Sequence, residues 1–361
     1  MNPVIPQPVP VPLPAPPGLL EFLLVFTFIL HLLAMNFLLG GVIILAVSSF
    51  LGRRDTRHQE LSRRVSRLLP PVTAFTITLG VAPLLFLQLV YGQFFYTSSV
   101  LMAWYWLAVV FLLLLGYYGV YWYQWQHNLS GPKGAWVIVV TAALFLLVAF
   151  IFTQNATAML HPEDFYPRFL DGRVGKILGP VSLVNLARLA HFVVAAVALS
   201  GLGIALISGR WRAESPELAA WARRYGVTWF MGGTVVQFLV GLWFLFSLPA
   251  EIRQALVGDK LALALLVAGV LLALLALLTA PVSLGVASLA ILGTVGAMAA
   301  LRHFVRLAYL HPYFDPHSLP VEGQWVLFSI FAVLLLTGLA TVGWMLYVFY
   351  RPAARIRRAS V

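Results

Sequence analysis

The sequence contains no cysteine, and only 10% of its residues are charged. The absence of cysteine excludes disulfide bonds, covalently attached haem c and thiolate-bound iron–sulfur clusters within this chain. The shortage of charge, with a hydrophobic fraction of 61%, excludes an ordinary soluble domain, in which about a quarter of the residues are charged. An integral membrane protein is therefore expected. Any haem in it must be bound non-covalently, through side chains such as histidine or methionine.

Several catalytic motifs are also missing. The sequence has no HExxH pattern, no carboxylate cluster, no glycine-rich phosphate loop and no nucleophile elbow. The 12 Asp and Glu residues are concentrated in loops, and none lies in the middle of an apolar span. This argues against an ion or proton path built from buried carboxylates. The net charge of +11 points to membrane topology and anionic lipid, not to nucleic acid.

Long apolar segments are abundant and predict an all-α, polytopic membrane protein. Several of these segments exceed the ~20 residues needed to cross a bilayer, so tilt or extension beyond it is expected. Residues 280–281 form either a kinked connection or a turn between two spans. The nine expected spans are 18–50, 69–97, 100–126, 135–153, 181–208, 226–249, 261–280, 283–308 and 325–350.

Arginines predict the orientation of these spans. With nine spans, the three arginine-rich segments lie on one side of the membrane, which the positive-inside rule makes the cytoplasm. The N-terminus and the loops 154–180 and 309–324 are then outside, and the C-terminus is cytoplasmic. We expect a proline-rich extended tail at 1–17, one transmembrane haem-binding domain at 18–350 and a basic tail at 351–361, in the cell inner membrane. The arginines are Arg53, Arg54, Arg57, Arg63, Arg64 and Arg67, then Arg210, Arg212, Arg223 and Arg224, then Arg351, Arg355, Arg357 and Arg358.

Three of the eight histidines, His31, His191 and His303, lie within apolar spans, where an ionisable ring is costly and a functional candidate. Neutral imidazole suits haem iron, and His191 and His303 at similar depth are a candidate pair of axial ligands. Arg188, and Arg302 with Arg306, stand beside these two histidines and suit haem propionates. The alternative is that the rings pack or hydrogen-bond against neighbouring helices.

The order and spacing of short motifs resemble the large, haem-bearing subunit of cytochrome bd quinol oxidase. The resemblance covers most of the chain, although each local match is short. It implies nine spans with the N-terminus outside, a high-spin haem at His31 and a low-spin haem at His191. The matching residues are His31 with Leu39-Gly40, Leu79-Gly80-Val81-Ala82, Tyr91-Gly92-Gln93, Gln154-Asn155, Pro180-Val181, Ala190-His191-Phe192, Arg302-His303, Gly343-Trp344 and Arg351.

The chain also departs from that family. The two glutamates of the family's third span fall near Trp106 and Leu114, and its glutamate ligand in the ninth span falls at Val348. His303 stands in for the family's methionine ligand, which implies a bis-histidine site. The resemblance therefore implies a low-spin haem at His191 and His303, leaves the haem at His31 without an evident second ligand, and argues against oxygen reduction.

These observations predict a membrane haem b subunit that passes electrons between the quinone pool and a c-type cytochrome, or another redox subunit, on the outer face. A haem with two histidine ligands transfers electrons but has no open position for oxygen. Two alternatives remain open: a terminal quinol oxidase with an altered proton path, and a haem-free membrane scaffold or transporter.

Overall fold

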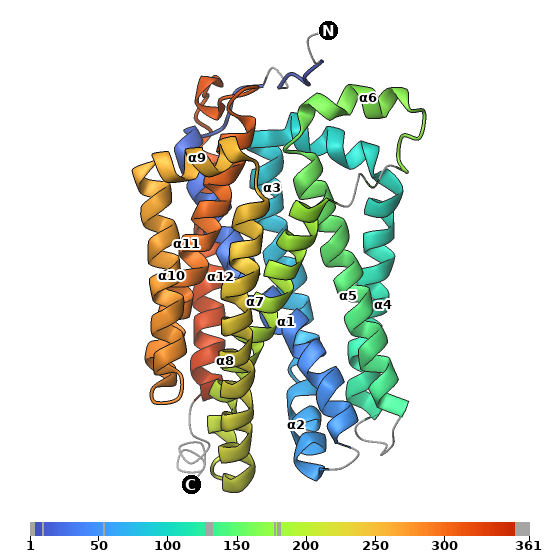
Figure 1. The fold of residues 1–361 in the computed structure, drawn as a ribbon, viewed down its shortest axis with the longest axis vertical. Coiled ribbons are helices and arrows are strands. Elements are labelled where there is room, and N and C mark those ends of the chain that lie inside the picture. The colour runs from blue at the N-terminus through green and yellow to red at the C-terminus, as the bar shows by residue number, and fades with distance from the viewer. Residues whose placement is uncertain are drawn as a thin grey trace.

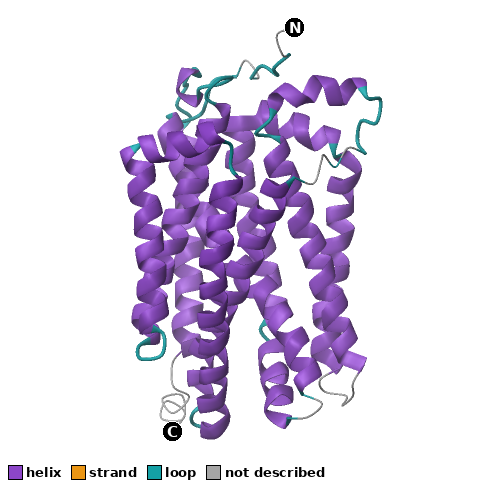
Figure 2. Cartoon of the chain, viewed as in Figure 1, coloured by secondary structure: helices purple, strands orange, loops and turns teal. Residues whose placement is uncertain are grey.

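The structure, a computed structural model, describes residues 4–8, 11–52, 55–126, 133–176, 178 and 182–350. Arg53, Arg54, Pro180, Val181 and the basic tail 351–361 therefore lie outside the described residues. No strand is assigned in the described part, so the all-α prediction is confirmed there (Figure 2). The helices are α1 (Pro17–Leu51), α2 (Thr56–Ser66), α3 (Leu69–Leu101), α4 (Ala103–Gln126), α5 (Lys133–Ala158), α6 (Phe165–Leu170), α7 (Leu183–Ile207), α8 (Pro216–Ser247), α9 (Ala250–Gly258), α10 (Lys260–Thr279), α11 (Leu284–Leu310) and α12 (Trp325–Tyr350).

Nine of the described helices are long and apolar enough to cross a membrane: α1, α3, α4, α5, α7, α8, α10, α11 and α12. This confirms the predicted polytopic architecture. Ala280 and Pro281 lie in a turn between α10 and α11, so this segment separates two spans. The start of α1 and the end of α12 lie at opposite ends of the bundle (Figure 1), and we call these the upper and the lower end.

The first span is the centre of the bundle. α1 packs against α3, α5, α7 and α11, while α8 packs along α7 and α10 along α11. Glycines allow these approaches: a Cβ on Gly40 would lie 2.0 Å from the carbonyl oxygen of Ala196, and one on Gly201 would lie 2.6 Å from the backbone of Phe230. Small residues at helix contacts are typical of membrane bundles, because burial of apolar surface from water does not drive association there.

Helix α8 begins earlier than predicted, at Pro216 instead of residue 226. Its first turns carry Arg223 and Arg224, and these charged residues lower the hydropathy below that expected of a membrane span. Proline at the first helical positions nevertheless starts a helix well, because its missing N–H would have no partner there. The helix α2 was not predicted either; it is amphipathic and buries Leu61 and Val65 against the lower end of the bundle.

The proline-rich segment is not a free tail. Its described residues before Pro17 are non-helical, as predicted, but Leu13 and Ala15 are buried. Leu13 pairs with Val321 in an isolated parallel bridge, with its N–H bonded to the carbonyl of Pro320 at 2.7 Å. The start of the chain is therefore fastened to the loop before the last span, on the upper surface.

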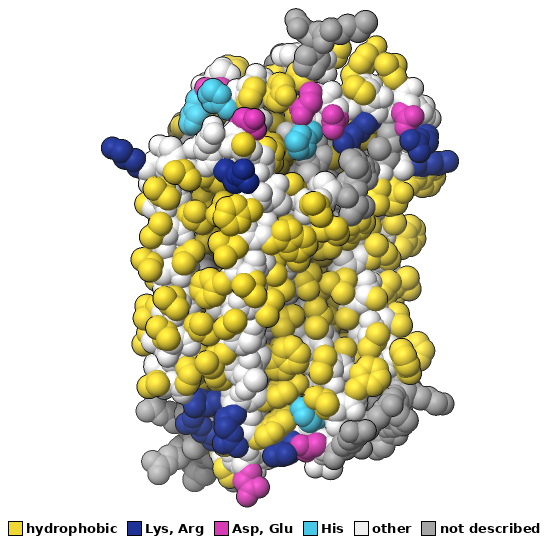
Figure 3. All heavy atoms as spheres, in the orientation of Figure 1, with side chains coloured by type: hydrophobic (Ala, Val, Ile, Leu, Met, Phe, Trp, Pro, Cys, Tyr) yellow, Lys and Arg dark blue, Asp and Glu magenta, His cyan; other side chains and the backbone are white. Residues whose placement is uncertain are grey.

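Charge is distributed unequally between the two ends of the molecule (Figure 3). The described lower end carries more arginines than carboxylates, whereas the described upper end carries more carboxylates than cations. The middle of the surface is apolar, which fits a membrane belt. The lower-end arginines are Arg57, Arg63, Arg64, Arg67, Arg210, Arg212, Arg223 and Arg224; the upper-end carboxylates are Glu163, Asp164, Asp171, Glu251, Asp259, Asp315 and Glu322.

Candidate functional site

His191 lies on α7 and faces α8. Its Nδ1 atom is 3.0 Å from Nε2 of Gln237, and its ring lies 5.8 Å from that of Phe244. A Cβ on Gly241 would lie 3.5 Å from the ring. Arg188 also packs over Phe244, at 5.5 Å, so the prediction that Arg188 and His191 share one helix face agrees with these contacts. The other ring nitrogen, Nε2, has no hydrogen-bond partner among the described residues.

Gln237 can hold either neutral form of His191. In the present rotamer its amide N–H donates to Nδ1, and its Oε1 atom is buried without a partner. A 180° rotation of the amide would bring Oε1 to accept Nδ1–H, which leaves the Nε2 lone pair for a metal. Metal-ligating histidines are usually oriented in this way by an acceptor on the second ring nitrogen.

His31, near the middle of α1, has a defined tautomer. Its Nδ1 atom lies 3.0 Å from the carbonyl oxygen of Thr76 on α3. A carbonyl oxygen only accepts, so the proton is on Nδ1, and Nε2 carries a free lone pair. A Cβ on Gly80 would lie 3.0 Å from both Nδ1 and Cε1 of the ring, so glycine leaves the space that the imidazole occupies.

His303, on α11, is engaged on both nitrogens. Arg306 Nη1 lies 3.2 Å from its Nδ1, and Glu21 Oε1 lies 3.5 Å from its Nε2. A guanidinium only donates and a carboxylate only accepts, so Nδ1 is the acceptor and Nε2 carries the proton. In this arrangement neither nitrogen of His303 offers a free lone pair to iron.

Glu21 is the buried carboxylate of a polar network at the upper end, with 8% of its surface exposed. The Tyr91 hydroxyl donates to its Oε1 at 2.9 Å, and Nε2 of the exposed His317 lies 3.6 Å from its Oε2. Tyr91 stands at a kink in α3, where its backbone leaves helical geometry. The network therefore connects the exposed loop before α12 with the buried ring of His303.

Three arginines, Arg188, Arg302 and Arg306, lie inside the upper part of the bundle. Their charges act on one another, and none forms an ion pair with a carboxylate among the described residues. Arg302 packs over Phe28 at 4.6 Å, and Arg306 packs over Tyr91 at 5.3 Å.

Glu21 is the one buried carboxylate of the described residues, and it lies within electrostatic reach of Arg306. An ion buried without a partner carries a penalty of several kcal/mol. The cluster of Arg188, Arg302 and Arg306 therefore favours a bound anion.

His191 and His303 are held by different neighbours. His191 takes its contacts from α8, whereas His303 takes its contacts from α1 and α3. Their pairing across one iron stays a prediction. His31, held by α3, is within electrostatic range of Arg302, so all three predicted histidines border the same arginine cluster.

The described residues contain no group of three or more His, Asp or Glu side chains that could hold a bare metal ion. One or two imidazoles hold iron well when a porphyrin supplies the other nitrogen ligands. The donor set fits a haem in this respect. His31 presents a free Nε2, the arginines match propionates, and Gln237 can orient His191.

No protein-family model matches the chain, and no curated protein matches its sequence. A search of solved structures finds the bd oxidase from Geobacillus thermodenitrificans, with a TM-score of 0.70 and 16% sequence identity. The match covers 94% of this chain and 100% of the other. This chain has a bd oxidase fold. The resemblance first inferred from short motifs is thus confirmed for the fold.

The positions where this chain departs from the resembling family are apolar in the structure as well. Leu114 and Val348 are exposed, at 50% and 43%, on apolar spans. Trp106 packs against Phe95 and Phe152, and its indole nitrogen is buried without a partner. None of these side chains can transfer a proton.

Sequence reasoning missed Glu21 and Gln237, and it named Tyr91 only as part of a family motif. Glu21 gave a signal, because a carboxylate in an apolar span is costly even near its end. Because Glu21 lies near the end of its span and not in the middle, it was not predicted to be a site residue. Gln237 gave none, because only the packing of α8 on α7 brings it to His191.

Proposed function

We propose that the protein is a haem b electron-transfer subunit of a membrane redox complex. One observation carries this proposal: His31 and His191 each have Nδ1 engaged and Nε2 without a partner, beside three buried arginines that lack paired carboxylates. That combination suits an iron porphyrin with anionic propionates. The bd oxidase fold is consistent with it.

Each residue would have a distinct role. Nε2 of His31 and Nε2 of His191 would each ligate iron, with Thr76 and Gln237 fixing the ring orientations. Arg188, Arg302 and Arg306 would neutralise propionates. Haem b, when bound, supplies one-electron transfer. For His303 to ligate the same iron as His191, Arg306 or Glu21 would have to release its contact with the His303 ring.

The redox partners belong to the same proposal. We assign quinol or quinone as the membrane-soluble reactant, on the basis of the family resemblance. A c-type cytochrome or another redox subunit would dock at the upper end, where carboxylates outnumber cations and a basic partner surface would be complementary. The loops that carry α6 and His317 supply that surface.

Optical spectroscopy of the purified protein tests the proposal. Reduced-minus-oxidised haem b bands are expected, and their absence would leave the haem-free scaffold or transporter. His191→Ala and His31→Ala should each remove bound haem, whereas His311→Ala, an exposed loop variant, should not. A full haem complement in both ligand variants contradicts the assignment.

Carbon monoxide separates the electron-transfer role from the terminal oxidase. A haem with two protein ligands does not respond, while a haem held by His31 alone has an open position. A carbon monoxide shift that disappears in His31→Ala would identify a haem with an open position at His31, and oxygen consumption that disappears in the same variant would favour the oxidase. His303→Met tests the sixth ligand, since Met/His ligation raises the reduction potential above that of a bis-histidine haem; an unchanged potential means that His303 does not ligate iron.

A further inference from the structure

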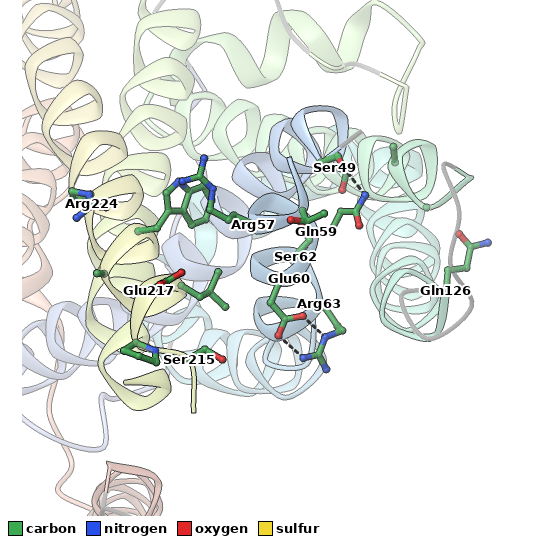
Figure 4. Close-up of a pocket in the computed structure, with 18 residues that line it drawn as sticks. Ser49, Arg57, Gln59, Glu60, Ser62, Arg63, Gln126, Ser215, Glu217 and Arg224 are labelled. Atoms are coloured by element: carbon green, nitrogen blue, oxygen red, sulfur yellow. Dashed lines mark hydrogen bonds and ion pairs between the residues drawn. The ribbon is translucent and has the colours of Figure 1, made fainter. Parts of the chain in front are cut away.

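Two cavities lie side by side at the lower end, and they differ in charge. The larger, of about 1630 Å³, is lined from α1, α2, α4, α5 and α8 and includes Arg57, Arg63, Glu60 and Glu217. Figure 4 shows Glu60 paired with Arg63 on α2, across from Glu217 and Arg224 on α8. With cations and carboxylates mixed in its lining, this cavity has no preference for an anion.

The smaller hollow, of about 430 Å³, is different. Its lining includes Arg212, Arg223 and Arg224 and contains no carboxylate. None of these three arginines forms an ion pair within the described residues, whereas Arg57, Arg63 and Arg64 on neighbouring α2 all do. Arg223 uses one N–H to reach the carbonyl of Pro281 at 3.0 Å and keeps the others free. The hollow therefore suits an external anion with several acceptor oxygens.

An apolar stripe on α8 begins at this hollow. From Arg224 the exposed residues continue at helical spacing through Thr228, Gly232, Val236 and Leu239, toward the middle of the span. The Thr228 hydroxyl donates to the carbonyl of Arg224 at 3.0 Å, so its proton is not available to a ligand. A Cβ on Gly232 would meet nothing within 4 Å, so the surface there is open.

We propose that Arg212, Arg223 and Arg224 bind the phosphate headgroup of an anionic phospholipid whose acyl chains lie along the exposed stripe of α8. The arginines supply forked donors to phosphate oxygens, and the stripe supplies the apolar surface that a free phosphate would not use. Basic pockets between membrane helices on the cytoplasmic side are suited to anionic headgroups. The site is independent of the haem proposal.

The test uses the delipidated full-length protein in detergent, titrated with dioleoylphosphatidylglycerol and followed by native mass spectrometry. Each arginine is expected to strengthen binding about fivefold, so R212Q/R223Q/R224Q should weaken it about a hundredfold. The matched control R57Q/R63Q/R67Q removes the same charge from α2 and its C-cap, at the same end of the molecule, and should change binding by less than about threefold. Replacing the three site arginines by lysine should restore most of the binding and shows that the loss is not misfolding.

Three outcomes would overturn the proposal. An equal loss in the site and control variants would mean that only the overall surface charge attracts lipid. Retention of dioleoylphosphatidylcholine as strong as that of phosphatidylglycerol would mean that the arginines do not select the headgroup. Displacement of the lipid by inorganic phosphate at the same concentration would mean a phosphate site without acyl-chain recognition.

Discussion

At the scale of single residues, hydrogen-bond partners distinguish three histidines that the sequence presents as equals. Thr76 fixes the proton of His31 on Nδ1, while Arg306 and Glu21 together occupy both nitrogens of His303. His191 lies between these cases, because the Gln237 amide can serve either tautomer. Whether a ring nitrogen has a free lone pair is therefore set by neighbouring groups, and Thr76, Glu21 and Gln237 are all distant in the sequence from the histidines that they contact.

Gln237→Leu tests the orientation of His191. The substitution removes the side chain that holds Nδ1, and loss of such a partner typically lowers metal affinity 10- to 100-fold. The haem signal assigned to His191 should fall accordingly on dilution or competition with apomyoglobin. Gln93→Leu is the matched control, since Gln93 is a buried glutamine whose amide nitrogen has no partner; an equal loss in both variants would contradict the role of Gln237.

Gly80→Ala tests the space beside His31. The new methyl group would lie 3.0 Å from Nδ1 and Cε1, so the ring must shift away from the Thr76 carbonyl. We expect a reduced haem-to-protein ratio or a shifted spectrum in this variant. Gly232→Ala, whose methyl group would meet nothing within 4 Å, should leave both unchanged. An unaltered spectrum in Gly80→Ala would mean that His31 holds no haem.

At the scale of helices, ion pairs between charged side chains stabilise α2, which is not one of the spans. Glu60 accepts from Arg63, and from Arg64 at 2.6 Å, and these bonds lower the pKa of its carboxyl to about 2. A carboxyl whose pKa is lowered by folding stabilises the fold at pH values above its ordinary pKa of 4.5. This contribution is lost as the pH falls through about 2.

Glu60→Gln should therefore loosen α2 at neutral pH. Because the pairs are solvent-exposed, screening limits the effect to about 0.5–1 kcal/mol, or roughly two- to fivefold faster amide exchange in α2. Comparing the two proteins at the same pH cancels the intrinsic exchange rate. The difference should be present at pH 7 and small near pH 2; a difference that persists near pH 2 would show that the carboxylate charge is not its cause.

The sequence predicted the elements better than the site. Nine spans were predictable because each is a long apolar run, although the sequence left residues 280–281 open as a kinked connection or a turn. The first turns of α8 were not predictable, because Arg223 and Arg224 lower the hydropathy there although the helix continues through them. Glu21, Tyr91 and Gln237 could not be assigned from spacing alone, because tertiary packing brings each to its histidine.

At the scale of the whole molecule, the asymmetry of charge predicts orientation. The described lower end has an excess of arginine, and the upper end has an excess of carboxylate. Under the positive-inside rule, we expect the lower end to face the cytoplasm and the N-terminus to lie outside.

The absence of cysteine makes this orientation testable with single-cysteine variants. In right-side-out vesicles, Glu322→Cys at the upper end should react with a membrane-impermeant maleimide. Glu217→Cys at the lower end should react only after the membrane is opened. Both positions are exposed carboxylates, so each serves as the control for the other. The reverse pattern would invert the topology.

The bridge between Leu13 and Val321 has a consequence for biogenesis. Leu13 meets its partner only after the intervening residues, which include eight of the nine candidate spans, have been made. Until the loop before the last span is made, the buried side chain of Leu13 lacks this pairing, and Glu21 lacks its contact with His317. Assembly of this surface is therefore a late event, and a nascent chain stalled before residue 317 would leave the polar network around Glu21 incomplete at the upper end.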